Sequence, residues 1–136
     1  MKMKRLLCSF LTIVALLVLA PSMNAKTPVN TSGKAWLDAH ADAALINVDG
    51  NWFAREWGPV ILNQSKNSRE ITGNGDGWDI TGVVSGKQIF LLFSSRGGVV
   101  YSAILTGSGE ASLDGSYTRG LMNDSAKGKS MHLTKK

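Results

Sequence analysis

The chain has 136 residues, a formal net charge of +5 and a mean hydropathy close to zero. This length indicates a single domain. Three of the fifteen Lys and Arg residues lie within the first five positions, which leaves twelve basic against ten acidic residues, too small an excess to favour nucleic-acid binding.

The first 25 residues have the layout of a secretory signal sequence. A basic start, Met-Lys-Met-Lys-Arg, precedes an apolar run of 15 residues from Leu6 to Ala20. About 20 apolar residues are needed to span a bilayer, so the run is typical of a cleaved signal rather than of the alternative, a membrane anchor. We expect cleavage after Ser22 or Ala25 and a mature protein in the periplasm or outside the cell.

The only cysteine, Cys8, lies near the start of this apolar run. Its position does not favour lipid attachment, because cleavage before it would leave nearly the whole run in place. We therefore expect a mature chain without cysteine or a transmembrane segment. Its stability would come from packing alone, without disulfides.

Residues 26–46 form a lead-in before the main domain. Residues 26–32 are polar and include one proline, whereas the stretch 33–46 is rich in alanine. Trp36, Leu37 and Leu45 recur at helical spacing within it, and Thr31 or Ser32 is available as a cap. The pattern predicts a short amphipathic helix over 33–46.

From residue 47 onward the pattern changes to short runs of large apolar and β-branched residues. Gly and Asn clusters interrupt the runs every 8 to 12 residues, which is typical of an antiparallel meander. We predict strands over 47–54, 58–64, 69–74, 77–84, 87–94, 99–106, 111–118 and 129–134.

Eight strands linked by hairpins leave two unpaired edges unless the sheet closes. We therefore predict an all-β fold for residues 47–136, an up-and-down barrel of about eight strands, with an incompletely closed sheet or a sandwich as the alternative. The interior of an eight-stranded barrel either is filled by side chains or holds one small ligand.

A weak repeat runs through the middle of this region. Ile71-Thr72-Gly73 recurs as Ile80-Thr81-Gly82. We interpret each copy as an inward apolar residue followed by a glycine at the hairpin bend.

The first strand contains Gly50-Asn51-Trp52, a Gly-x-Trp motif that resembles the lipocalin and avidin group of barrels. The longer string, with Trp57-Gly58-x-Val60-x-Leu62-x-Gln64, is similar to small exported bacterial β-meander proteins. The resemblance implies that Gly50 and Trp52 close one end of a barrel. It does not extend to biotin binding, because Ala54 and Gly58-Pro59 stand where avidin-like proteins place polar contacts.

Trp57 and Trp78 lie near predicted strand ends, where an indole can either close a barrel mouth or stack on a ligand. With Tyr101 on the strand 99–106, they are our candidate ligand-binding residues. The basic tail from Lys127 offers a second possibility, contact with anionic lipid, although lysines there would also protect a terminal strand edge.

Two adjacent strands are apolar on both faces, although a strand exposed on one face usually alternates with polar residues. The residues expected to point outward are Phe90, Leu92, Val100 and Ile104. Three arrangements would bury them: coverage by the helix over 33–46, coverage by a partner subunit, or a ligand cavity. Left uncovered, they would form a partner surface.

The sequence does not favour catalysis. His40 and His132 are the only histidines, and neither belongs to a recognisable metal-binding spacing. The loop from Asn74 to Asp79 lacks the acidic residue that closes a calcium loop. We expect no enzymatic activity, metal or cofactor.

Two function classes follow. The first is a non-enzymatic exported binding protein for a small apolar molecule or a protein partner, with a homo-oligomer as a further option. The second is an inhibitor or accessory protein that acts on another exported protein through residues 26–46.

Overall fold

The computed structural model describes residues 31–108, 111–123 and 127–136. The predicted signal sequence (1–25) and the first part of the lead-in (26–30) lie outside these residues. Within the described part of the chain, no helix has the length and apolar character needed to cross a membrane.

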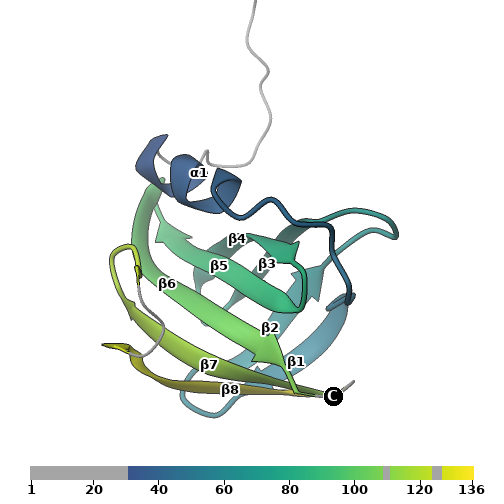
Figure 1. Cartoon of the computed structure of the whole chain (residues 1–136). Coiled ribbons are helices and arrows are strands. Elements are labelled where there is room, and N and C mark those ends of the chain that lie inside the picture. The colour runs from purple at the N-terminus through teal and green to yellow at the C-terminus, as the bar shows by residue number, and fades with distance from the viewer. Residues whose placement is uncertain (1–30, 109–110, 124–126) are drawn as a thin grey trace, which may run out of the picture.

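The molecule is a closed antiparallel barrel of eight strands with one short helix before it (Figure 1). Each strand pairs with the next, and β1 pairs with β8, which closes the sheet. The predicted barrel is confirmed, and every predicted strand end lies within three residues of the observed one. The elements are α1 (Thr31–Asp38), β1 (Gly50–Ala54), β2 (Gly58–Asn63), β3 (Glu70–Gly75), β4 (Trp78–Ser85), β5 (Gln88–Ser95), β6 (Gly98–Gly107), β7 (Ser112–Arg119) and β8 (Lys129–Lys135).

The barrel interior is filled by the protein's own side chains. Residues at alternate positions of each strand point inward and meet in one buried cluster. Its members are Val48, Trp52, Ala54, Val60, Leu62, Ile71, Ile80, Val84, Ile89, Leu91, Phe93, Ala103, Leu105, Leu113, Met131 and Leu133. The core that stabilises this chain is therefore the barrel lumen itself.

Trp52 is the largest fully buried side chain, with 2 % of its surface exposed. Its indole Nε1 donates a hydrogen bond to the Val48 carbonyl at 2.8 Å, so the one polar atom of the ring is satisfied inside the core. Gly50, two residues earlier, has a φ of 142°, a conformation that favours glycine. Both residues of the Gly-x-Trp motif thus lie at the start of β1, where the chain enters the barrel.

The predicted helix over 33–46 is wrong beyond Asp38, where α1 ends. Residues 39–49, which we call the strap, run extended across one end of the barrel. The backbone explains the change, because Leu45 donates its N–H to the Gly86 carbonyl at 2.9 Å and Gly86 donates to Ala43 at 3.0 Å. Bonds to the β4–β5 turn replace the helical ones and override the helix propensity of the alanines. Leu45 consequently points outward, with 68 % of its surface exposed.

Gln64 fastens the strap to the barrel. Its side-chain Oε1 accepts a hydrogen bond from the Val48 backbone N–H at 2.7 Å, and its Nε2 donates to the Ser68 carbonyl at 2.8 Å. The Asp49 carboxylate accepts the backbone N–H of Gln64 at 2.8 Å. The glutamine in the string after Trp57 therefore has a structural role, as a buried amide with both ends satisfied.

A second cluster lies outside the barrel, beneath α1. Leu37 packs there with Phe90, Leu92 and Ile104, which have 3, 0 and 9 % of their surface exposed. The indole of Trp36 donates to the Met122 carbonyl at 2.7 Å and ties the helix to the β7–β8 connection. The first of the three arrangements considered for this face, coverage by the helix, is the one that the structure has.

The fourth residue considered for that face, Val100, is half-buried, and Val99 packs against the cluster instead. The register explains the exchange. Phe93 pairs with Tyr101 but Ser94 pairs with Val99, so a bulge at this point changes which residues of β6 face outward. Sequence alternation alone does not reveal such a shift.

The repeated glycines do not lie at hairpin bends, so that interpretation is wrong. Gly73 and Gly82 stand in the middle of β3 and β4. A Cβ atom at Gly73 would lie 2.0 Å from the Ile61 carbonyl oxygen, and one at Gly82 would lie 2.3 Å from that of Phe90. The glycines are needed because the neighbouring strand approaches closely in a strongly curved barrel.

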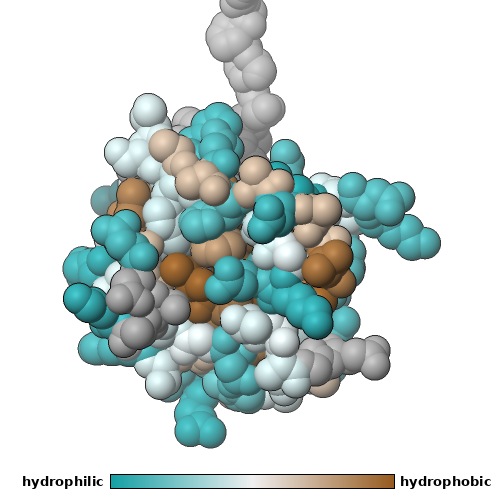
Figure 2. Space-filling view, viewed as in Figure 1, coloured by the Kyte–Doolittle hydropathy of each residue, from teal (hydrophilic) through white to brown (hydrophobic). Residues whose placement is uncertain are grey.

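Polar side chains dominate the face shown in Figure 2, and apolar ones gather only in small separate patches. Among the described residues, the large apolar side chains that remain exposed are Leu45, Phe53 and Ile61. Single exposed apolar residues are common on soluble proteins and indicate no function by themselves.

His40 makes the attachment of α1 sensitive to pH. Its ring stacks on Phe90 with centroids 3.6 Å apart, and burial lowers its pKa below the ordinary value of about 6.5. The unfolded chain then binds a proton that the folded protein resists, so stability is lost as pH falls below about 6.5. We expect the unfolding free energy to decrease between about pH 7.5 and pH 5, and to decrease less in a His40→Phe variant, which keeps the stacking. Urea unfolding at both pH values tests this; equal pH dependence would contradict it.

Candidate functional site

Five aromatic side chains meet at the barrel end opposite the strap. We call this group the aromatic mouth; it consists of Trp57, Trp78, Phe93, Tyr101 and Tyr117. Trp57 lies in the β1–β2 connection, Trp78 begins β4, and the other three lie on β5, β6 and β7. Because successive strands run in opposite directions, residues far apart in sequence arrive at the same end.

The rings pack edge to face, as aromatic pairs prefer. Trp57 is the centre, with its ring centroid 4.5 Å from Phe93, 5.1 Å from Tyr117 and 5.4 Å from Tyr101. Trp78 adds contacts at 5.5 Å to Tyr101 and 6.4 Å to Trp57. These distances leave no space for a molecule between the rings. Phe93 is buried and the other four are half-buried, so the mouth is closed but presents ring surface to solvent.

A depression of about 410 Å³ adjoins the mouth on its β7–β8 side. Three cationic side chains and no acidic one line it among the described residues. The lining residues are Tyr101, Tyr117, Thr118, Arg119, Lys127, Gly128 and Lys129. The guanidinium carbon of Arg119 lies 5.3 Å from the centre of the Tyr101 ring, close enough for a cation–π contact. The described lining of this depression is thus cationic.

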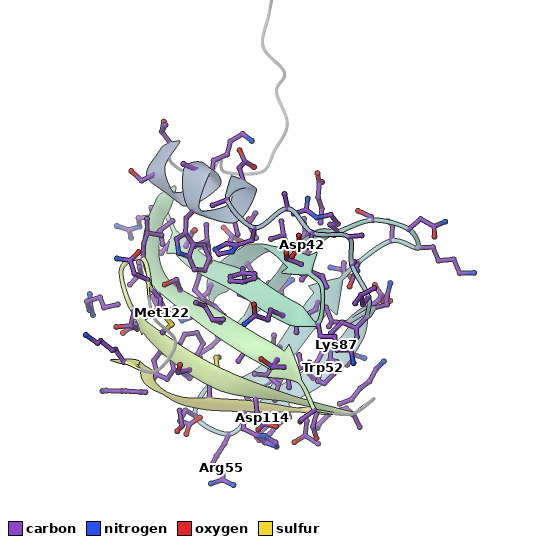
Figure 3. The ribbon with its side chains drawn as sticks, in the orientation of Figure 1. Asp42, Trp52, Arg55, Lys87, Asp114 and Met122 are labelled. Carbon is purple, nitrogen blue, oxygen red and sulfur yellow. The ribbon has the colours of Figure 1, made fainter. Side chains whose placement is uncertain are left out.

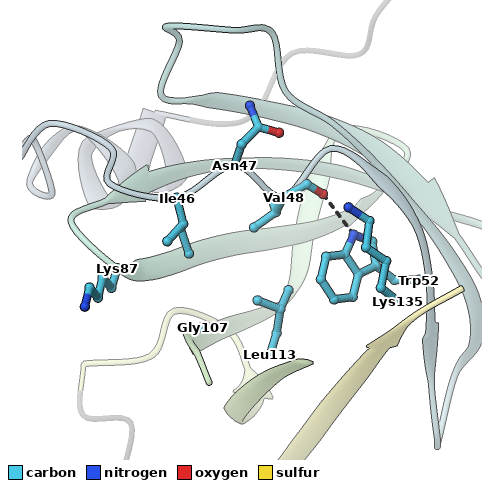
Figure 4. A pocket seen from close by; sticks show the side chains of 8 residues that line it. All are labelled: Ile46, Asn47, Val48, Trp52, Lys87, Gly107, Leu113 and Lys135. Atoms are coloured by element: carbon cyan, nitrogen blue, oxygen red, sulfur yellow. Dashed lines mark hydrogen bonds between the residues drawn. The ribbon is translucent and has the colours of Figure 1, made fainter. Parts of the chain in front are cut away.

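The strap end of the barrel has a cavity of its own, about 440 Å³, between the strap and the β6–β7 turn (Figure 4). Figure 3 labels two of its lining residues, Trp52 and Lys87, and Figure 4 shows their side chains at opposite sides of the cavity. Three of its apolar lining residues, Val48, Trp52 and Leu113, expose only 1 to 2 % of their surface, and the fourth, Ile46, is half-buried. The Lys135 ammonium lies 5.6 Å from the Trp52 ring centre and covers it further.

A row of polar side chains links β7 to β8 on the outside of the barrel. His132 Nδ1 bonds to the Asp114 carboxylate, and His132 Nε2 lies 3.2 Å from the Thr134 hydroxyl. The Ser108 hydroxyl donates to Asp114 at 2.5 Å, and this bond, followed by the one to His132, lowers the pKa of that carboxyl. The His132 and Asp114 side chains are 43 and 50 % exposed, so water screens the pair. The row is a surface link between two strands.

The basic tail does not form one patch. Lys127 and Lys129 lie beside the aromatic mouth, whereas Lys135 lies at the strap end. Lys136 lies over the exposed ring of Phe53, with its ammonium 5.4 Å from the ring centre. Among the described residues there is no group of three or more His, Cys, Asp or Glu side chains placed to hold a metal ion.

The three residues predicted as ligand contacts, Trp57, Trp78 and Tyr101, all meet at the aromatic mouth. Tyr117 and Arg119 were missed. The signal for Tyr117 was its even spacing from Leu113, which puts both on one face of β7. A comparison of the chain with protein-family models, curated proteins and solved structures finds no match in any of the three.

Proposed function

We propose that the mature protein is an exported, non-enzymatic binding protein whose ligand site is the aromatic mouth. One observation carries the proposal: half-buried rings from separate strands converge beside a depression lined by cations. Binding sites usually combine aromatic surface with a few polar groups that fix orientation. The resemblance to lipocalin-like and avidin-like barrels agrees with a binding role but does not supply a ligand.

The site lies at the mouth and not in the lumen. Sixteen buried side chains fill the barrel interior, so a small apolar molecule has no space there without displacing them. The depression beside the mouth, at about 410 Å³, has the size of a small-molecule site. The ligand is therefore a small ring-bearing molecule that lies against the exposed edges of the aromatic cluster.

The described part of the lead-in favours this function over an inhibitory arm. Leu37 is buried in the second cluster, and the strap is bonded to Gln64 and Gly86. A segment held this way cannot extend into a partner's active site without unfolding part of its own protein. Residues 31–46 thus act as a structural element of the barrel.

Binding of 1-naphthyl phosphate, measured by calorimetry, tests the proposal. We expect saturable binding that weakens about 2- to 10-fold in a Trp78→Ala variant, which corresponds to the typical value of one aromatic contact. Phe53→Ala is the matched control, because Phe53 is an exposed ring on the outside of β1. Absence of saturable binding, or an equal loss in the control, would contradict the proposal.

A further inference from the structure

We infer that the ligand of the aromatic mouth carries an oxyanion group, such as a phosphate ester, which binds between Arg119, Lys127 and Lys129. The inference rests on the proposed function and adds the chemical class of the ligand. It depends on different side chains from those that define the aromatic mouth, so the two can fail separately.

The register between neighbouring strands places two of the cationic residues opposite the two tyrosines. Tyr101 is paired with Arg119 across β6 and β7, and Tyr117 is paired with Lys129 across β7 and β8. Directly opposed residues in antiparallel strands have Cβ atoms about 4.5–5.5 Å apart. Each of the two tyrosines therefore lies beside one cationic residue of the neighbouring strand, at the same end of the barrel.

The residues offer the donors that an oxyanion needs. Arg119 carries a planar fork of N–H groups, which binds phosphate and carboxylate oxygens in pairs. Its side chain is already positioned, because a guanidinium nitrogen lies 3.4 Å from the Tyr101 hydroxyl and the group stacks over that ring. The two lysine ammonium groups add charge, and the tyrosine hydroxyls are further donors.

The charge distribution favours an anion over other ligands. Among the described lining residues, no carboxylate neutralises the three cations. Like charges near one another repel, and an anion bound between them offsets this repulsion by its attraction to each. Lys34, by contrast, has a carboxylate partner, Asp38, at 3.1 Å.

Gly128 lets the β7–β8 connection lie closely against β7. A Cβ atom there would lie 2.6 Å from the Tyr117 carbonyl oxygen and 2.5 Å from the Met122 side chain. The backbone between Lys127 and Lys129 therefore lies directly against β7, which brings both lysines to the rim. This close approach and the pairing of Tyr117 with Lys129 together place the two lysines beside Tyr117.

Calorimetric titrations with three probes, 1-naphthyl phosphate, 1-naphthol and inorganic phosphate, test the inference. We expect the phosphate ester to bind at least about tenfold more tightly than the naphthol, and its affinity to fall with added salt. In an Arg119→Gln/Lys129→Gln variant this preference is expected to be lost. The matched control is Lys66→Gln/Lys87→Gln, which removes the same charge from exposed positions at the strap end.

The three titrations test the proposed binding site and the oxyanion inference separately. If the ester and the naphthol bind equally, and both depend on Trp78, the oxyanion inference is wrong and the proposed function stands. If no probe binds, both are wrong. Equal losses in the two double variants would also overturn the inference, because a general charge effect would then explain the preference.

Vesicle co-sedimentation distinguishes a lipid headgroup from a soluble ligand as the source of the oxyanion. The vesicles contain phosphatidylcholine with or without phosphatidylglycerol. Binding to the anionic vesicles that requires Arg119 and Lys129 supports a headgroup, whereas binding of the soluble ester alone supports a free ligand. Failure to bind either probe overturns the inference.

Discussion

Replacement of Trp52 by alanine is expected to lower the free energy of unfolding by about 3–5 kcal/mol, the usual cost of removing a large aromatic side chain from a core. The ring is 2 % exposed at the centre of the strap end, and its indole satisfies the Val48 carbonyl. Folded domains are stable by only about 5–15 kcal/mol, so much of the stability would be lost. Urea unfolding followed by circular dichroism measures the change.

Two further variants show which property of Trp52 stabilises the protein. Trp52→Phe keeps an aromatic ring but leaves the Val48 carbonyl without its donor, which we expect to cost about 1–3 kcal/mol. Phe53→Ala, on the exposed face of the same strand, should cost clearly less. If Trp52→Ala costs no more than Phe53→Ala, Trp52 does not hold the barrel core together.

The double replacement Trp36→Ala/Leu37→Ala is expected to detach α1 and make the protein aggregate. A buried leucine replaced by alanine loses about 2–5 kcal/mol, and the hydrogen bond from Trp36 to Met122 is lost as well. Detachment would expose Phe90, Leu92 and Ile104 as one apolar surface. Analytical ultracentrifugation and light scattering measure the outcome.

Lys34→Ala is the control for this helix. The Lys34 ion pair with Asp38 is 72 and 63 % exposed, so its loss should have little effect. If the double variant stays monomeric and as stable as the original, α1 is not a cover. Residues 31–46 would then be free to act as an arm, and the inhibitor hypothesis would regain support.

The number and positions of the strands could be predicted because period-two alternation and glycine clusters are local signals. The end of α1 could not be predicted in this way. Alanines at 39–44 favour a helix locally, but the Ala43 carbonyl and the Leu45 N–H bond to Gly86 in the β4–β5 turn, which lies about 40 residues away in sequence. Tertiary partners of this kind leave no local signature.

The two glycines of the repeat are a second case in which the local sequence does not reveal a tertiary contact. Gly73 and Gly82 are mid-strand residues whose absent side chains let neighbouring strands approach, although their sequence context is also typical of a turn. Likewise, a single bulge replaces Val100 by Val99 on the outer face of β6. Register and curvature, which decide both cases, are properties of the closed sheet.

The candidate site was predicted in part. Trp57, Trp78 and Tyr101 were found because aromatic residues at strand ends tend to close or line a mouth. Their convergence with Tyr117 depends on which ends of four strands meet, and the cationic rim depends on cross-strand register. Arg119 could be linked to Tyr101 only after the barrel was known.

The most direct test uses the indole N–H resonances of the four tryptophans while 1-naphthyl phosphate is added. We expect the signals of Trp57 and Trp78 to shift with saturation. The signal of Trp52, which is hydrogen-bonded to the Val48 carbonyl at the opposite end of the barrel, should stay unchanged. A shift of the Trp52 signal without shifts of Trp57 and Trp78 would place the ligand at the other end of the barrel and contradict a binding site at the aromatic mouth.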